Sequence, residues 1–189
     1  MRKTCINKKT MKKILFFSFV FALPVILAGC GAGEKIGQKA GEKIMEKTIE
    51  AQTGQKVDIN QSGDNVTIKS EDGKSTISGG GDTKAPDNFP TELIVASDAK
   101  IFMSSTSETG SSVSYNTDTD QAALYEKYTT GLADLGWAKD SGIDMGNAKI
   151  VNLSKGASKA IITIGDNNSK DKAQKNMVNV TLVEEKAQE

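Results

Sequence analysis

The carboxyl-terminal half of the chain alternates between apolar and polar positions in several short runs. Within 157–164, the residues Ala160, Ile162 and Ile164 fall on one side, and residues 177–183 repeat the pattern. Such alternation is typical of strands that bury one face. We therefore expect strands at residues 93–96, 100–104, 112–117, 148–153, 157–164 and 177–183.

Residues 119–135 carry the clearest helical pattern. Apolar side chains share one face by i, i+3, i+4 spacing, namely Leu124, Tyr125, Tyr128, Leu132 and Leu135. Asp118 with Gln121 is similar to a capping box, and Gly136 suits the position after the helix end. We expect Trp137 to turn back onto the same face. One helix between two groups of hairpin-linked strands predicts an α+β fold, with one amphipathic helix packed on an antiparallel sheet.

A four-residue repeat precedes this domain, reading GEKI-GQKA-GEKI-MEKT over residues 33–48. The pattern predicts an amphipathic helix with Glu and Lys on its polar side. Its apolar side consists of Ile36, Gly37, Ala40, Gly41, Ile44, Met45, Thr48 and Ile49. Two roles remain open for this Glu/Lys-rich helix. It is either a spacer from the membrane, or a helix that lies on lipid or packs on a partner protein.

A nine-residue rhythm comes after the helix. The triplets at 57–59, 66–68 and 75–77 each combine Val or Ile with polar residues, and turn residues separate them. This spacing predicts a short β-meander over residues 55–78. Residues 79–88 contain three glycines and a proline, which mark a linker, so they separate the meander from the α+β domain at 89–186.

The first thirty residues resemble an export signal. A basic stretch with six Lys or Arg residues is followed by the uncharged run 14–28 and then by Leu27-Ala28-Gly29-Cys30. This tetrad resembles the lipobox of bacterial lipoproteins. The resemblance implies a signal peptide at 1–29 that is cut between Gly29 and Cys30. It also implies a diacylglycerol on the Cys30 thiol, with a further acyl chain such as palmitate on the new amino terminus.

An uncleaved membrane helix is the competing interpretation of this segment. Residues 14–33 are uncharged and long enough to span a bilayer. However, residues 29–33 are mostly glycine and favour a helix poorly.

The layout of the whole chain is similar to a recurrent arrangement among uncharacterised bacterial lipoproteins that carry a small carboxyl-terminal α+β domain. The matching features are Cys30, the Glu/Lys-rich helix, the strand segment 57–77, Phe89-Pro90 and Leu135-Gly136-Trp137. The resemblance implies location and architecture, and no activity. The expected organisation is completed by a lipid anchor and helix at 30–54 and a tail at 187–189. The expected location is outside the cytoplasm, on the outer membrane if the source has one and otherwise on the outer face of the cell membrane.

Composition excludes several kinds of chemistry. The chain has no histidine, and its cysteines are Cys5 and Cys30. We therefore expect no imidazole base, no disulfide and no cysteine or histidine metal site in the exported part. The chain has 24 basic and 24 acidic residues, and the first thirty residues hold six of the basic ones and none of the acidic ones. The chain beyond Cys30 is therefore acidic, and we expect no nucleic-acid partner.

Candidate site residues are few. Tyr125, Tyr128 and Trp137 form either a stacking patch or part of the core, and the serines within 104–112 form either an exposed turn or a binding rim. Residues 166–171 begin like a calcium loop but lack its glycine and place Lys170 at a ligand position, which favours a solvated turn. We expect no catalytic residue, no metal and no cofactor.

Three hypotheses about function remain open. The first is a lipid-anchored, non-catalytic interaction module that binds an envelope protein or polymer. The second is an envelope hydrolase that uses paired carboxylates. The third is a small-ligand carrier, which would need an apolar pocket of several hundred Å³, whereas the interaction module needs only a filled core.

Overall fold

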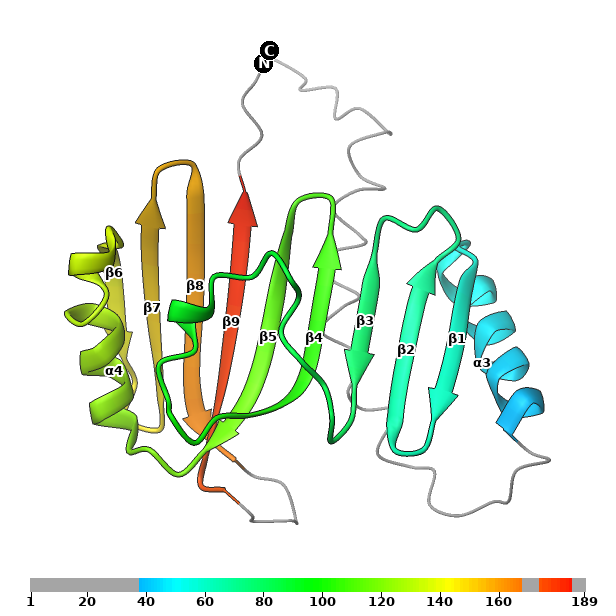
Figure 1. Ribbon diagram of the computed structural model, residues 1–189, viewed down its shortest axis with the longest axis horizontal. Coiled ribbons are helices and arrows are strands. Elements are labelled where there is room, and N and C mark those ends of the chain that lie inside the picture. Colours follow the sequence, from blue (N-terminus) through cyan, green and yellow to red (C-terminus); the bar gives the residue numbers. More distant parts are fainter. Residues whose placement is uncertain (1–37, 168–173, 185–189) are drawn as a thin grey trace, which may run out of the picture. The chain divides into compact units, whose positions relative to one another are not determined.

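The computed structural model describes residues 38–167 and 174–184, which form a nine-stranded antiparallel sheet with two α-helices (Figure 1). The strand order across the sheet is β1-β2-β3-β4-β5-β9-β8-β7-β6. The strands are β1 (Val57–Ser62), β2 (Asn65–Ser70), β3 (Thr76–Gly79), β4 (Lys100–Ser107), β5 (Gly110–Thr117), β6 (Ala138–Asp144), β7 (Ala148–Lys155), β8 (Ser158–Asp166) and β9 (Asn176–Glu184). The helices are α3 (Gln38–Thr53) and α4 (Gln121–Thr129), with short 3-10 turns η1 (Thr91–Leu93) and η2 (Ala133–Leu135).

The predicted α+β class is wrong, because the fold is largely β. Helix α4 has nine residues and packs mainly on β7 and β8, so it covers a small part of one face. The sheet is also larger than expected, because β3 pairs with β4 from Thr76↔Thr106 to Gly79↔Met103. The strands of the β-meander therefore continue the same sheet. This pairing joins segments about thirty residues apart, and local sequence patterns carry no information about it.

The helix predicted at 119–135 is shorter than expected and begins at a different cap. Asp120 is the N-cap, and its side chain accepts hydrogen bonds from the backbone N–H groups of Ala122 and Ala123. Asp118 instead accepts one from the backbone of Lys175. The left-handed Gly136 ends η2, as the sequence predicts for the end of the helical segment.

The apolar patterns of the sequence, helical and alternating, correctly locate most of the core. Leu124, Tyr128, Leu132 and Trp137 are buried as predicted, whereas Leu135 is 49% exposed. The segment 93–96 is not a strand, since Thr91–Leu93 form η1, and strand β6 was not predicted. The buried residues of this core are Phe89, Leu93, Ala96, Val113, Tyr115, Leu124, Tyr128, Leu132, Trp137, Val151, Leu153, Ala160, Ile162, Ile164, Val178, Val180 and Leu182.

Helix α3 lies beside the edge strand β1 (Figure 1), and its inward face is rotated from the predicted apolar side: Gly41, Met45 and Ile49 are half-buried, whereas Ile44 and Thr48 are exposed. Ile44 is 66% exposed, although the pattern places it on the apolar side. Glu42 and Glu46 instead turn toward the sheet, where their Oε1 atoms accept hydrogen bonds from the backbone N–H groups of Gln61 (2.9 Å) and Ile59 (3.1 Å). The predicted residues Ile36 and Gly37 lie outside the described residues.

The spacing of the glutamates along α3 matches the spacing of alternate residues along β1. Residues four apart on a helix rise about 6 Å, and alternate residues on a strand are about 6.6 Å apart. Two successive carboxylates of the tetrad repeat, on Glu42 and Glu46, therefore reach the N–H groups of two alternate residues of β1, Gln61 and Ile59. Among the described residues, neither helix is long and apolar enough to cross a membrane.

A buried tyrosine pair fastens α4 to the sheet and to η1. The Tyr128 hydroxyl donates to the Leu93 carbonyl (2.7 Å), so the 2.9 Å bond between the two hydroxyls uses the Tyr115 proton. Burial raises the pKa of Tyr115 to about 12 and raises that of Tyr128 well above its usual value of 10. The site therefore stabilises the neutral forms of both rings.

This pair predicts a loss of stability in alkali. Because both folded-state pKa values lie above the unfolded value, the stabilisation is complete below pH 10 and is lost as the pH rises toward 12. The loss for Tyr115 alone is roughly 2 to 3 kcal/mol. Urea unfolding followed by fluorescence between pH 8 and pH 12 measures it. Tyr125→Phe is the control and should keep the full loss, whereas Tyr128→Phe should reduce it; equal losses in both variants would contradict the assignment.

Candidate functional site: a hydroxyl-lined groove

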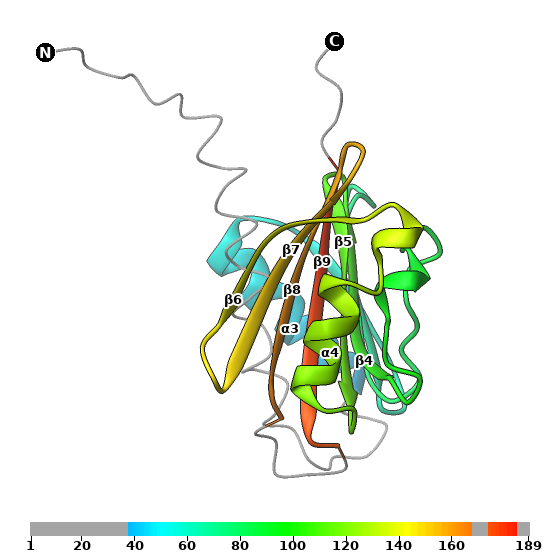
Figure 2. The same cartoon turned by 90° about the vertical axis from the view of Figure 1, so that its left-hand side faces the viewer.

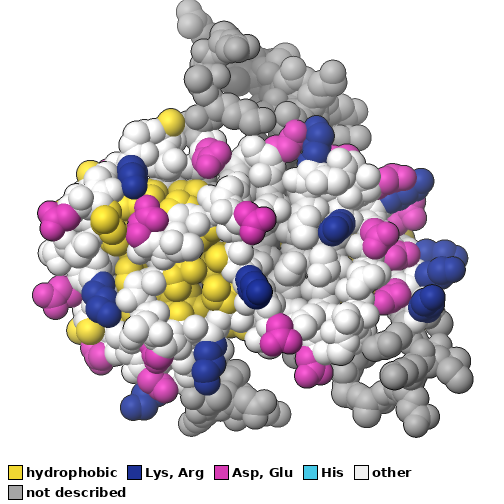
Figure 3. Space-filling view, in the orientation of Figure 1, with side chains coloured by type: hydrophobic (Ala, Val, Ile, Leu, Met, Phe, Trp, Pro, Cys, Tyr) yellow, Lys and Arg dark blue, Asp and Glu magenta, His cyan; other side chains and the backbone are white. Residues whose placement is uncertain are grey.

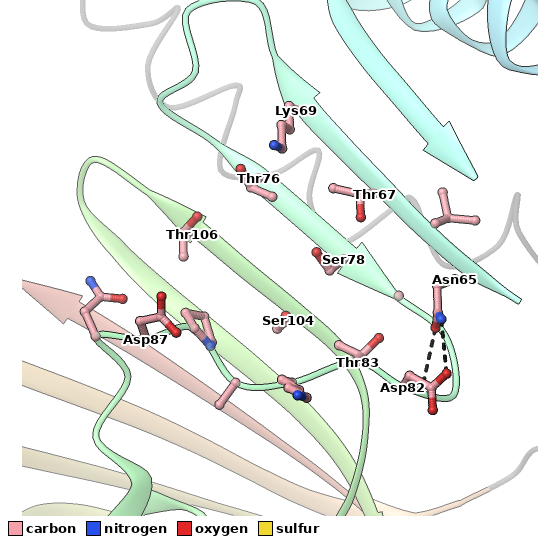
Figure 4. Close-up of a pocket in the computed structure, with 16 residues that line it drawn as sticks. Asn65, Thr67, Lys69, Thr76, Ser78, Asp82, Thr83, Asp87, Ser104 and Thr106 are labelled. Atoms are coloured by element: carbon pink, nitrogen blue, oxygen red, sulfur yellow. Dashed lines mark hydrogen bonds between the residues drawn. The ribbon is translucent and has the colours of Figure 1, made fainter. Parts of the chain in front are cut away.

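Two rows of polar side chains cross β2, β3 and β4 on the face that carries the core (Figure 4). In the first row, Thr67 pairs with Ser78 and Ser78 pairs with Ser104. In the second row, Lys69 pairs with Thr76 and Thr76 pairs with Thr106. Since paired residues of an antiparallel sheet point to the same face, these six side chains form one floor.

Both rows continue across the whole sheet through the same pairing register. Their side chains are polar on β2–β4 and become apolar beyond the middle of the sheet. Ser104 pairs with Val113, which pairs with Val180, and the row continues to Ile162 and Val151. The connection between β3 and β4 and helix α4 lie on the same side of the sheet, where the connection contributes Phe89 and Leu93 to the core (Figure 2). Seen from this side, hydrophobic side chains gather over the half with α4, and the half with β1–β4 shows mainly polar groups (Figure 3).

The hydroxyl groups of the floor form no hydrogen bonds with the described part of the chain. Among the described residues, no hydrogen bond involves the side chains of Thr67, Thr76, Ser78, Ser104 or Thr106, and no ion pair involves Lys69. Nearby, the Oγ atom of Ser111 is buried and has no hydrogen-bond partner in the ranges 38–167 and 174–184. Ser111 pairs with Thr106, so it extends the second row under the core. Unused donors and acceptors on a concave surface are the chemistry that a polar ligand needs.

The connection after β3 forms one wall of the groove. It contributes Asp82, Thr83, Lys84, Ala85, Pro86, Asp87 and Asn88. Asn65 holds this wall, because its side-chain oxygen accepts from the Asp82 N–H (3.2 Å) and its amide donates to the Asp82 carboxylate (3.4 Å). Gly80 crosses so close to the β1–β2 turn that a Cβ atom there would overlap the Asn65 side chain and the Asp64 carbonyl.

The groove encloses about 710 Å³, and a second groove of about 700 Å³ continues it over β1 and β2. Thr67 and Lys69 line both, so the two are contiguous along the sheet. Lys69 and Lys84 are matched by Asp82 and Asp87 in the first groove, which leaves it without net charge. Within the described part of the chain, no aromatic side chain lines either groove. The arrangement favours an elongated, uncharged polar ligand.

The aromatic residues singled out in the sequence occupy three different environments. Tyr128 is buried in the hydroxyl pair described above, and Trp137 is 3% exposed with its indole N–H 3.4 Å from a Glu92 carboxylate oxygen. Tyr125 is half-buried, with the ammonium groups of Lys139 and Lys149 at 5.5 and 5.8 Å from its ring centre. The structure does not bring the three rings together on one open surface.

The serines of the segment 104–112 divide between the two faces of the sheet. Ser104 lies on the groove floor and Ser111 beside it, whereas Ser105 and Ser112 hydrogen-bond to each other through their hydroxyls (2.8 Å). Ser107 lies at the hairpin and bonds to the Gly110 carbonyl.

Other predicted sites lie partly or wholly outside the described residues. This holds for Leu27, Ala28, Gly29 and Cys30. Of the segment that begins like a calcium loop, Asp166 accepts a hydrogen bond from Gln121 (2.7 Å), and residues 168–171 are not described. Within the described ranges, no cluster of three or more Cys, Asp or Glu side chains could hold a metal ion.

Apart from Ser104, which is one of the serines considered as a binding rim, the groove residues were not predicted from the sequence as a site. The available signal was the polar side of each meander strand, where Thr67 and Lys69, and then Thr76 and Ser78, alternate with Ile or Val. Comparison of the chain with family models, curated proteins and solved structures finds no match.

Gly80 provides a test of the groove wall. We expect Gly80→Ala to lower the free energy of unfolding by about 1 to 3 kcal/mol, because the new methyl group overlaps backbone and because φ is +129°. Gly81→Ala is the matched control, since nothing lies within 4 Å of a Cβ atom there, and it should change stability by less than about 0.5 kcal/mol. Urea unfolding measures both, and equal effects would contradict the close approach at Gly80.

Proposed function

We propose that this protein is a lipid-anchored envelope protein that binds a polysaccharide strand of the envelope, without catalysis, through the hydroxyl-lined groove. The observation that carries the proposal is the pair of rows on β2–β4, whose hydroxyls and one ammonium have no partner among the described residues. A sugar polymer presents hydroxyls as both donors and acceptors, so it can satisfy such a floor along its length.

The shape and lining of the grooves favour a polymer over a small carried ligand. A carrier needs an apolar enclosure, whereas the floor here carries hydroxyls, the wall carries charged and amide groups, and the two grooves are contiguous over four strands. On the same face, the apolar half of the sheet is filled by the side chains of α4, η1 and Trp137.

The carboxyl groups favour binding over hydrolysis. A general acid needs a raised pKa, and each described carboxyl with a resolved shift has a lowered one. The largest shift is at Asp98, where hydrogen bonds from Thr117 and from the Asp118 backbone lower the pKa to about 2. None of these four groups lines either groove.

The anchor is supported by the sequence alone, through the lipobox that ends in Cys30. Two or three acyl chains hold a protein on a membrane stably, because each buried CH₂ contributes about 0.8 kcal/mol. The expected location is the membrane surface outside the cytoplasm, on the outer membrane where the source has one.

Mass spectrometry of protein extracted from membranes tests the anchor. We expect a chain that begins at Cys30 and carries diacylglycerol with an additional acyl chain. Cys30→Ser should abolish the lipid and release the chain from the membrane, whereas Cys5→Ser should change neither. A mass that retains residues 1–29 without lipid would refute the anchor.

Removal of hydroxyls from the floor tests the groove. We expect Thr67→Val with Thr76→Val to weaken co-sedimentation with isolated envelope polysaccharide about 25-fold, because each lost hydrogen bond is worth about 1 kcal/mol. The control is Thr163→Val, which removes an exposed hydroxyl from the opposite face of β8. Equal binding by all three proteins, or no binding by the unmodified protein, would contradict the proposal, and capture of a protein in place of polysaccharide would reassign the ligand.

A further inference from the structure

Helix α3 separates its charges between two sides. Glu42 and Glu46 are half-buried, and their carboxylates accept hydrogen bonds from backbone N–H groups at the edge of β1. The three lysines of the described helix, Lys39, Lys43 and Lys47, are all exposed. Successive lysines are four residues apart and advance about 40° around the axis, so the three cover an arc of about 80°.

This lysine stripe is not neutralised by its neighbours. Among the described residues, no ion pair within 4 Å involves Lys39, Lys43 or Lys47. Glu50 is the one exposed carboxylate of the helix, so the outward surface keeps a net positive charge although the whole helix has equal numbers of Glu and Lys. The sequence alone indicates a mixed face, and the hydrogen bonds to β1 make it cationic by turning two carboxylates inward.

An exposed apolar side chain stands beside the stripe. Ile44 is 66% exposed and lies about 60° from Lys47 around the helix axis. A helix that presents lysines together with an exposed aliphatic side chain on one side is typical of peripheral contact with a bilayer, where the lysines meet anionic headgroups.

The anchor places this surface near a bilayer. Only seven residues separate Cys30 from Gln38, and chain geometry limits their reach to about 28 Å. We propose that the lysine stripe of α3 docks on anionic phospholipid headgroups and so fixes the orientation of the sheet on the membrane. The proposal rests on the lipid anchor of the proposed function, and it is independent of the groove. Each lysine close to an anionic surface multiplies the docked population about fivefold, and the anchor already confines the helix to that surface.

Lysine acylation on vesicles tests the docking. The lipidated chain is reconstituted in vesicles of phosphatidylcholine alone or with about one-third phosphatidylglycerol, and a membrane-impermeant amine reagent labels the exposed lysines. We expect labelling of Lys39, Lys43 and Lys47 to fall at least about fivefold on the anionic vesicles. Lys84 and Lys100, exposed elsewhere on the sheet and its connections, should label equally on both. High salt should restore labelling of the stripe.

Charge reversal provides the matched variants. Lys43→Glu should restore the labelling of Lys39 and Lys47 on anionic vesicles, and Lys100→Glu should leave their protection unchanged. Equal labelling on both vesicle types, or equal protection on both, overturns the docking and leaves the anchor in place. A chain that binds only the anionic vesicles overturns the anchor and keeps the docking, and a chain that binds neither overturns both.

Discussion

Continuous register across the sheet is the constraint on which the other features depend. Because side chains alternate between the faces of each strand, one register decides together which residues enter the core and which line the groove. The row that begins at Thr67 on β2 ends among the aliphatic side chains of β7, and its character changes between Ser104 and Val113. A slip of one residue would turn Val113 away from the core and bury Ser112 in its place. The buried half therefore fixes the position of the polar half.

Charged groups protect both edge strands of the sheet from pairing with another strand, in a different way at each edge. At β1, the carboxylates of Glu42 and Glu46 occupy backbone N–H groups that would otherwise pair with another strand. At β6, all residues are exposed, and a register shift lies between Lys139 and Ser141. Irregularity and charge are common protections of an exposed edge. The period of four in the tetrad repeat thus has a structural explanation. Glutamates four residues apart on a helix have the spacing of alternate residues on a strand, so both can reach β1.

The sequence predicts local structure well and long-range pairing poorly. Strands β5, β7, β8 and β9 show clear alternation because one face is buried, and each was located within a few residues. Strand β6 was missed because its sequence, AKDSGID, has no apolar alternation and its side chains are all exposed. The pairing of β3 with β4 depends on residues about thirty positions apart, so neither the nine-stranded sheet nor the groove built on it was predicted. Thr67, Lys69, Thr76 and Ser78 were visible in the sequence only as the polar side of the meander, and Ser104 only as one of the serines of a candidate rim.

The position of β9 has a consequence for how the chain matures. This strand comes after all the others in the sequence, yet it lies between β5 and β8 and pairs with both. Until it has been synthesised, two strands of the core lack their neighbour, and Val178, Val180 and Leu182 are missing from the interior. Such late, non-local closure delays cooperative folding. The sheet can therefore close around its core only after residues 176–184, the last strand, have been synthesised.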